Sequence, residues 1–429
     1  MVNSKPVSDS NWYFEKGLDI ASGKGYSIEG TPTAYYPVGY PFFLGLIFMI
    51  FGNNLFAAKI TNVLLAVGIL YFSYFTSKKM FDSERVGRIT LFILAIYPNH
   101  IAYSSIIATE TLFLFLILFG AYLFFIAKNN YWLFMASGFI WGLMCLVKPQ
   151  GFFIPILFLL ALWLQEKKTF REALKPMMII YVIVIIALLP WAIRNYYVFN
   201  EPFIISTNDG INLVMGNNPY ATGEYNLDDK VIEFIWDSEN EYATPDSLVN
   251  SLRYTAFWTR YGYKDENIAN KKLRKKAVDY IFSNPSKIMK LLPRKLWLNY
   301  KKGNEGIGWA ISELTIEGTL KKNIISALGK IANYFYYLSM AFFFFYFVRF
   351  AYKSYIEKEK LQVPLIGPLI ILYFTLLALI YFGTYRFHFP TLPFIAMFSA
   401  AFAESLLNTG RKKKKFKERL PGNETKKFY

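Results

Sequence analysis

The sequence is poor in the residues that build most disulfides and metal sites. Among its 429 residues there is one cysteine, Cys145, and there are two histidines, His100 and His388. A single cysteine excludes an intramolecular disulfide and a metal site made of several thiolates. Both histidines lie in aromatic surroundings, which favour packing over metal ligation. We therefore expect neither a metal nor another cofactor.

Acidic residues are also scarce. There are 30 Asp and Glu against 47 Lys and Arg, a net charge of +17. In a soluble protein such an excess indicates nucleic acid. Here the bases collect in short segments between long apolar runs, which is typical of loops that face the cytoplasm and anionic lipid. We expect membrane lipids as partners and no nucleic acid. The first 35 residues lack the apolar core of a signal peptide.

Apolar residues are abundant and arranged in long runs. The composition is 54% hydrophobic and 19% aromatic, and about 20 apolar residues suffice to cross a bilayer as a helix. The pattern predicts an all-α polytopic membrane protein. We expect nine membrane spans, at about residues 55–77, 86–104, 107–127, 131–147, 150–165, 177–199, 330–352, 362–383 and 387–408.

The spans divide the chain into five segments. Residues 1–54 form a first loop that ends in a short apolar helix at 36–52, which is punctuated by Pro37 and Pro41 and is expected to lie at the membrane interface. Residues 55–199 form an N-terminal bundle, 200–329 a large loop, 330–408 the last spans and 409–429 a basic tail. Within the large loop, 267–283 and 285–299 have the apolar periodicity of amphipathic helices.

The distribution of bases predicts the orientation. Residues 77–88, Lys128, 165–175, 353–360 and the tail after residue 410 are rich in Lys and Arg, whereas the alternating short connections are not. The positive-inside rule places the rich set, including the C-terminus, in the cytoplasm. The first loop and the large loop then face outward from a plasma or inner membrane.

Given this topology, a few ionisable residues converge on the outer ends of the spans. They are Asp9, Glu110, Lys148, Arg194 and Arg386, with His100 and His388 nearby. Ionisable residues at the edge of an apolar zone usually face a cavity or a partner. Two acids and three bases fit the transfer of a group from a lipid phosphate, since bases stabilise phosphate charge and an acid accepts a proton.

Each of these residues also has a structural interpretation. Glu110 is placed to stabilise a helix N-terminus. Lys148 and Arg194 are placed to extend toward the interface, and Arg386 belongs to an aromatic interfacial belt. The glycine-rich segment 23–30 follows no predicted strand and opens no predicted helix, so we do not expect a nucleotide site there.

Six segments of the chain resemble, in family order, GT-C membrane glycosyltransferases. They are residues 8–27 (SDSNWYFEKGLDIASGKGYS), 33–52 (TAYYPVGYPFFLGLIFMIFG), 97–116 (YPNHIAYSSIIATETLFLFL), 146–157 (LVKPQGFFIPIL), 189–225 (which contains RNYYVFNEP and GNNPY) and 385–398 (YRFHFPTLPFIAMF). The resemblance is strongest to the dolichyl-phosphate-mannose–protein mannosyltransferases and the aminoarabinose transferases, and it extends over almost the whole chain.

The resemblance implies an enzyme that transfers a hexosyl or pentosyl group from a polyprenyl-phosphate donor to a lipid, glycan or protein acceptor. It implies that Asp9 is the catalytic base and Glu110 a second catalytic acid. Lys148, Arg194 and Arg386 would bind the donor phosphate. Further substrate contacts would come from Tyr35, Tyr36, His100, Asn217, Asn218 and His388. Enzymes with such donors usually need no metal.

One departure from the family pattern concerns the start of the chain. Family members begin with a membrane helix directly before the Ser-Asp loop, so we expect that one helix precedes residue 1 in the complete protein.

Two other functions compete with sugar transfer. A transporter or flippase of a lipid-linked or anionic solute would show repeats and buried midplane charges, which the sequence lacks. A polysaccharide polymerase or ligase would share the basic outer cavity.

Overall fold

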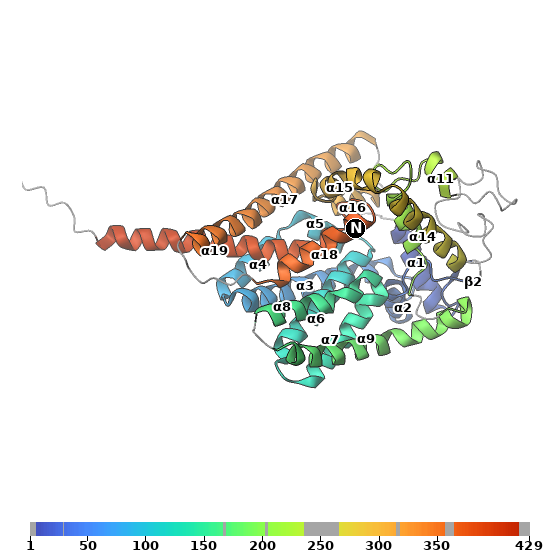
Figure 1. Ribbon diagram of the computed structural model, residues 1–429, viewed down its shortest axis with the longest axis horizontal. Coiled ribbons are helices and arrows are strands. Elements are labelled where there is room, and N and C mark those ends of the chain that lie inside the picture. Colours follow the sequence, from blue (N-terminus) through green and yellow to red (C-terminus); the bar gives the residue numbers. More distant parts are fainter. Residues whose placement is uncertain are drawn as a thin grey trace, which may run out of the picture.

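The computed structural model describes residues 6–28, 30–165, 169–201, 205–235, 266–314, 318–356 and 364–419, with the backbone alone at 165, 170 and 409–419. Parts of the predicted large loop and basic tail, residues 236–265 and 420–429, lie outside this description. Across the described residues the chain is helical except for one two-stranded hairpin and the connecting segments. Several long helices run roughly along the long axis of the molecule (Figure 1). The predicted all-α class is confirmed.

The N-terminal elements are two short helices with a hairpin between them. They are α1 (Asp9–Ala21), β1 (Ser27–Ile28), β2 (Thr31–Pro32) and α2 (Gly39–Phe51), and β1 pairs antiparallel with β2. A Cβ added at Gly17 of α1 would lie 2.8 Å from the Cβ of Leu44 in α2. Because Gly17 has no side chain, α1 and α2 can pack closely. This packing positions the N-terminus of α1.

The first helical bundle follows. Its elements are α3 (Leu55–Phe81), α4 (Glu84–Ala95), α5 (Pro98–Ser104), α6 (Thr109–Ala127), α7 (Tyr131–Val147), η1 (Pro149–Phe153), α8 (Ile154–Gln165) and α9 (Phe170–Phe199). Side-chain hydrogen bonds cap the N-termini of several of these helices. The side chain of Asn54 accepts a hydrogen bond from the Ala57 amide (3.1 Å), and Ser83 accepts one from Val86 (3.2 Å). Thr169 and Glu172 form a capping box at the start of α9.

The second half of the chain begins with short helices and ends with long ones. Its elements are α10 (Asp209–Gly216), α11 (Asp229–Ile235), α14 (Glu266–Ser283), α15 (Pro285–Tyr300), α16 (Glu305–Ser312), α17 (Gly318–Tyr355), α18 (Ile366–Ile380), η2 (Phe389–Thr391) and α19 (Leu392–Arg419). The two amphipathic segments predicted at 267–283 and 285–299 are helices, α14 and α15. The helix predicted within 36–52 is α2.

Not every predicted span is a long helix. Among the described residues, five helical segments are long and apolar enough to cross a membrane: Leu55–Phe81, Thr109–Ala127, Arg171–Phe199, Gly318–Tyr355 and Phe389–Asn408. Four apolar helices are shorter: Gly39–Phe51, Tyr131–Val147, Pro149–Leu164 and Ile366–Ile380. The prediction of one continuous span at 86–104 is wrong, because α4 ends at Ala95 and Pro98 starts the separate helix α5. Proline has no amide hydrogen to continue the α4 ladder. The polytopic class stands, but the count of nine is not established.

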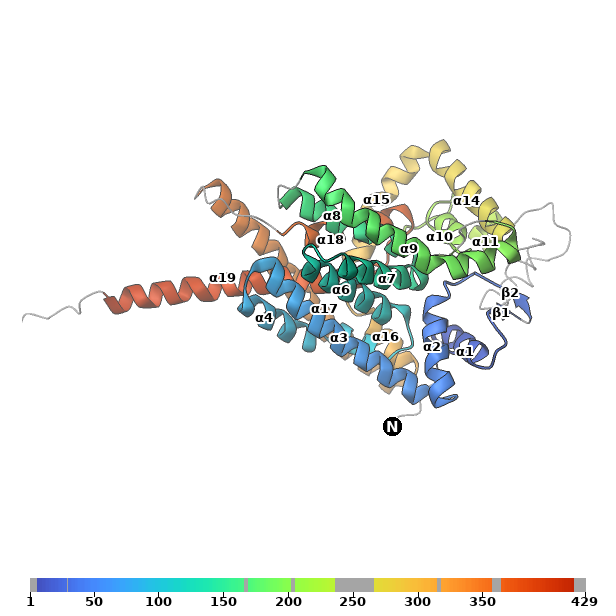
Figure 2. The ribbon, with the colours of Figure 1, turned by 90° about the horizontal axis from the view of Figure 1, so that it is seen from below.

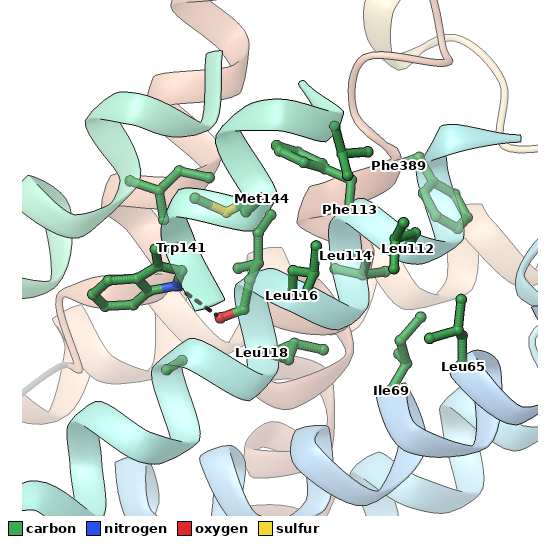
Figure 3. Close-up of a cluster of buried hydrophobic side chains, with 14 of the residues drawn as sticks. Leu65, Ile69, Leu112, Phe113, Leu114, Leu116, Leu118, Trp141, Met144 and Phe389 are labelled. Carbon is green, nitrogen blue, oxygen red and sulfur yellow. Dashed lines mark hydrogen bonds between the residues drawn. The ribbon is translucent and has the colours of Figure 1, made fainter. Parts of the chain in front are cut away.

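The apolar core lies around α6, which is buried along nearly all of its length. Figure 3 shows Leu112, Phe113 and Leu116 of α6 between Leu65 and Ile69 of α3 on one side and Trp141 and Met144 of α7 on the other. The Trp141 indole donates a hydrogen bond to the Ile117 carbonyl at 3.4 Å. A Cβ at Gly120 would lie 2.3 Å from the Trp141 nitrogen, so only glycine permits this approach of α6 and α7.

The two ends of the molecule differ. In Figures 1 and 2, α1, α2, α10, α11 and α14 gather at one end, while the C-terminal part of α19 projects from the opposite end. The charged residues described next belong to the first of these ends, since they lie at the start of α1 and α6, the end of α7 and the segment between α18 and η2.

Candidate active site

Asp9 lies in the first turn of α1, where a carboxylate interacts favourably with the helix dipole. Ser8, directly before it, has a positive φ of 54°, which turns the chain into the helix. The hydroxyl of Tyr36, from the segment before α2, donates to Asp9 Oδ1 at 3.3 Å. Asp9 Oδ2 accepts a second, charged hydrogen bond from Arg386 Nη1 at 2.9 Å. The α1–α2 packing therefore presents Asp9 to a residue 377 positions away in the chain.

Glu110 lies in the first turn of α6 and has no exposed side-chain surface. Its Oε1 atom accepts from both Arg386 Nε at 2.6 Å and Lys148 Nζ at 2.9 Å. Thr109 donates to the other oxygen at 3.3 Å. A buried carboxylate is stable only when it is paired in this way. Glu110 thus joins the two bases to the start of α6.

Lys148 and Arg386 come from two breaks in helical structure. Lys148 follows the end of α7 and adopts an extended conformation before Pro149, which prevents the helix from continuing. Arg386 lies in the segment between α18 and η2, and its guanidinium covers the Trp309 ring at 4.8 Å. Burial opposes the charge of Arg386, but the carboxylates of Glu110 and Asp9 outweigh it and raise its pKa. Arg386 is therefore a permanent cation.

Together these residues form a continuous ionic chain of two acids and two bases, which we call the Asp9–Lys148 cluster: Asp9, Arg386, Glu110 and Lys148. Its members differ in exposure. The side chains of Asp9, Arg386 and Lys148 are 20%, 25% and 16% exposed, whereas Glu110 is 0% exposed. Asp9 is accordingly the accessible carboxylate of the cluster, and Glu110 is the buried one that pairs with both bases.

Arg194, predicted with these bases, makes other contacts. Its guanidinium donates to the carbonyls of Thr33 (2.9 Å) and Tyr26 (2.8 Å) and covers the Trp191 ring at 4.7 Å. These contacts hold the hairpin segment that connects α1 to α2. Among the described residues, Arg194 has no hydrogen bond or ion pair with the Asp9–Lys148 cluster. Its role in phosphate binding stays a prediction.

The two histidines are buried. His388, two residues after Arg386, pairs through Nδ1 with the Asn299 carbonyl at 2.6 Å and stacks between the rings of Tyr300 and Tyr336. His100 lies in α5 and is 6% exposed. In the part of the chain that the structure describes, no three His, Cys, Asp or Glu side chains form a group able to hold a metal ion.

The other residues predicted to contact substrate lie in two places. Two tyrosines lie beside Asp9, and two asparagines lie at the end of α10. Tyr36 reaches Asp9, and Tyr35 packs against Tyr36 with ring centroids 4.9 Å apart. Asn217 donates to the Ile380 carbonyl at 2.8 Å and accepts from Lys295 at 3.0 Å. Asn218 donates to carbonyls of α10. Asn217 therefore holds α10 against the end of α18, next to the segment that carries Arg386, whereas Asn218 bonds within α10.

Sequence reasoning missed the contribution of α16. Trp309 of this helix covers Arg386, and Glu305 at its start lies close enough to be attracted by Arg386 and to pair with Tyr385. Burial raises the pKa of Glu305, and these two neighbours oppose the shift. In the sequence, this helix is indicated only by a Glu and a Trp among glycines at 303–309. That short pattern does not stand out within a predicted loop as long as 200–329.

Comparisons with known proteins agree with this architecture. Residues 36–193 match the family model described as dolichyl-phosphate-mannose-protein mannosyltransferase. No curated protein sequence matches the chain significantly. Among solved structures, the oligosaccharyltransferase AglB of Archaeoglobus fulgidus, in complex with an inhibitory peptide and a dolichol-phosphate, has 16% sequence identity and a TM-score of 0.53. The match covers 99% of this chain and 49% of AglB.

Two further structures extend the comparison. The Archaeoglobus fulgidus oligosaccharyltransferase tethered to an acceptor peptide has 14% identity and a TM-score of 0.52, over 95% of this chain and 46% of that one. ArnT from Cupriavidus metallidurans in the apo state has 14% identity and a TM-score of 0.39, over 94% and 73%. The chain thus spans about half the length of the oligosaccharyltransferases that it matches. Its fold is that of the GT-C membrane glycosyltransferases, as the resemblance implied, and residues 36–193 carry the mannosyltransferase family pattern.

Proposed function

We propose that this protein transfers a sugar from a polyprenyl-phosphate-linked donor to an acceptor hydroxyl, with Asp9 as the catalytic base. The observation that carries the proposal is the Asp9–Lys148 cluster. It places one accessible carboxylate 2.9 Å from a permanent cation, and a fully buried carboxylate fixes that cation and a second base. The family match over residues 36–193 supports the same chemistry.

The proposed reaction is a single displacement at the sugar carbon C1. Asp9 accepts the proton of the acceptor hydroxyl as its oxygen forms a bond to C1. The bond between C1 and the donor phosphate oxygen breaks, and the phosphate leaves with the electron pair, which inverts the configuration at C1. A base of this kind accelerates transfer by about 10²- to 10⁴-fold. Arg386 and Lys148 stabilise the negative charge that develops on the leaving phosphate.

Because Arg386 and Asp9 form an ion pair, binding of the donor would also change the state of the Asp9 carboxylate. The Nη1 group of Arg386 neutralises Asp9 in this structure. A donor phosphate that takes this hydrogen bond releases the carboxylate, which is then free to accept a proton. We assign Glu110 to positioning, since its bonded oxygen already accepts from both bases and its side chain is inaccessible.

The donor class and the orientation belong to the same proposal. The AglB structure of the same fold holds a dolichol-phosphate, a lipid of the kind expected as the leaving group. We place the cluster at the outer face of the membrane and the C-terminal tail in the cytoplasm, because the positive-inside rule favours that arrangement. The sugar would be a hexose or a pentose, and the acceptor a lipid, a glycan or a protein.

Turnover of a radiolabelled polyprenyl-phosphate monosaccharide by membranes that contain the protein tests the proposal. Release of polyprenyl phosphate together with a labelled acceptor is expected. A diphosphate-linked oligosaccharide is the matched second donor, because the likeness to oligosaccharyltransferases favours an oligosaccharide transferase as the second candidate. Movement of the intact donor across proteoliposomes without any transfer would replace the enzyme by a flippase.

A further inference from the structure

The helix α15 presents three different faces. At about 100° per residue, Lys295, Leu298 and Asn299 share one face and are buried against the protein. Met289, Leu296 and Trp297 share a second face and are 68%, 43% and 68% exposed. The third face carries exposed bases at intervals of three and four residues: Lys287, Lys290 and Arg294. A helix that packs against a protein normally leaves its polar side outward, so the exposed apolar face needs another covering.

The surroundings of α15 place that face beside the apolar helix α18. Lys295 donates to the Leu379 carbonyl at 3.0 Å, and Tyr300 pairs with Thr375 at 2.5 Å. Both contacts are with the last turns of α18. This apolar helix leaves a stripe of its own exposed, with Leu372 at 53%, Leu376 at 47% and Ile380 at 52%. The spacing of four residues makes it one continuous face, and α15 lies where that face ends.

The basic face has little to neutralise it within the protein. Arg294 lies 3.9 Å from Glu224. Lys287 and Lys290 form no ion pair with the described residues, and both side chains are exposed. Figure 2 shows α14 and α15 at one edge of the molecule.

We propose that α15 lies in the headgroup layer of the membrane. Met289, Leu296 and Trp297 contact acyl chains, and Lys287 and Lys290 bind the phosphates of anionic phospholipids. An apolar stripe bordered by lysines, with a tryptophan at the boundary, is the pattern of a helix that lies in this layer. Each lysine near an anionic surface adds to the attraction. A partner protein would not account for the position of this stripe at the end of α18.

The buried face of α15 links this docking to the segment that carries Arg386. The Asn299 carbonyl pairs with His388 at 2.6 Å. A Cβ at Gly383 would lie 2.1 Å from the Lys295 carbonyl oxygen, so the backbones of α15 and residue 383 are in direct contact. Docking of α15 to headgroups therefore holds the Arg386 segment at a defined depth relative to the membrane surface.

The test uses the single cysteine of the chain. In a Cys145→Ser background, Met289→Cys on α15 and Lys275→Cys on α14 each receive a fluorophore that senses its environment. The labelled proteins are placed in nanodiscs of phosphatidylcholine, with or without phosphatidylglycerol. We expect lipids brominated on the acyl chain to quench the label at 289 several-fold more than the label at 275, and phosphatidylglycerol to increase the difference.

Charge variants test the phosphate contact. Lys287→Glu with Lys290→Glu should abolish the response of the label at 289 to phosphatidylglycerol. Lys24→Glu with Lys275→Glu makes the same change of charge away from α15 and should preserve it. If the glutamate pair does not fold, as judged by thermal melting, Lys287→Gln with Lys290→Gln takes its place.

Three outcomes would overturn the proposal. Equal quenching at 289 and 275 would show that α15 is outside the lipid. Shielding of position 289 from water without quenching by acyl bromine would show that protein covers the face. An unchanged response to phosphatidylglycerol in the α15 variants would remove the phosphate contact. None of these measurements uses sugar transfer, so they are independent of the proposed function.

Discussion

At the scale of single residues, the two carboxylates of the cluster differ in their exposure and in their hydrogen-bond partners. Glu110 is fully buried and accepts from Arg386, Lys148 and Thr109. Asp9 is 20% exposed and bonds to Arg386 and Tyr36. Two carboxylates of the same intrinsic chemistry thus have different surroundings, because one is partly exposed and the other is enclosed by cations.

The first prediction concerns Asp9. Asp9→Asn removes the proton acceptor but preserves the shape of the side chain, so transfer should fall by at least about 10²-fold while the donor still binds. Turnover and donor binding are measured on the same membranes. Asp19→Asn is the matched control on α1, where Asp19 pairs with Lys16, and it should retain transfer. Normal turnover by Asp9→Asn would remove Asp9 from the mechanism.

The second prediction concerns Glu110. Glu110→Gln removes the buried carboxylate that two half-buried cations share and should lower the free energy of unfolding by roughly 3–5 kcal/mol. Unfolding is followed in detergent. Glu84→Gln removes the acid of an exposed pair with Lys78 and should change the stability far less than Glu110→Gln does. Addition of Lys148→Met to Glu110→Gln should restore part of the stability. No recovery in that double variant would contradict the assignment of Glu110 as the partner of Lys148.

At the scale of elements, the position of Arg386 depends on neighbours distant in sequence. The end of α10 packs against the backbone at Tyr381, α15 against Gly383, and α16 covers the guanidinium with Trp309. The first two contacts are close because glycine, Gly216 or Gly383, stands at the point of contact. The segment from 381 to 388 is therefore shaped by three helices rather than by its own sequence.

The third prediction tests this arrangement. A Cβ at Gly216 would lie 1.7 Å from the Tyr381 carbonyl oxygen, so Gly216→Ala must displace the segment before Arg386. A shift of about 1 Å in a catalytic group can cost about 10²-fold in rate. We expect transfer to fall by that order and the melting temperature to fall with it. Gly308→Ala, where nothing lies within 4 Å, should leave both unchanged. Wild-type turnover by Gly216→Ala would contradict the proposed support of Arg386 by α10.

The fourth prediction concerns Lys295, which fixes α15 to α10 and α18. Burial lowers the pKa of Lys295 to about 8, against 10.5 for an exposed lysine. Between these values the folded protein holds the neutral amine while the unfolded chain remains protonated. Because the unfolded state then binds more protons, this group makes the folded protein more stable as pH rises from about 8 to 10.5.

The measurement is a comparison of two proteins. Melting temperatures of the wild type and of Lys295→Met are recorded from pH 7 to pH 10.5, so that titration of all other groups cancels. The difference, wild type minus variant, should increase with pH above about 8. A constant difference across this range would mean that burial does not lower the pKa of Lys295.

At the scale of the whole molecule, the distribution of charge predicts which end of the helical bundle is cytoplasmic. The turn between α3 and α4 is flanked by Lys78, Lys79, Arg85 and Arg88. The Asp9–Lys148 cluster lies at the ends of helices on the other side of the bundle, near the hairpin that follows α1. The positive-inside rule then predicts that the turn is cytoplasmic and that the cluster lies outside.

The fifth prediction tests this orientation. In the Cys145→Ser background, Lys24→Cys beside the hairpin should react with a membrane-impermeant maleimide in intact cells. Asp82→Cys in the turn between α3 and α4 should react only after the membrane is permeabilised. Both positions are exposed in the structure, so protection reports the membrane rather than the fold. The reverse labelling pattern would place the active site in the cytoplasm.

The sequence alone determined the class of the protein, the place of most helices and all four residues of the Asp9–Lys148 cluster as candidates. Apolar runs and proline positions act locally, and ionisable residues beside such runs are rare enough to stand out. Only the tertiary structure decided that Arg386 bridges Asp9 and Glu110, that Arg194 holds the hairpin segment, and that α16 contributes Trp309. These contacts join residues separated by up to 377 positions, and which of several bases reaches a given acid depends on how closely the helices pack.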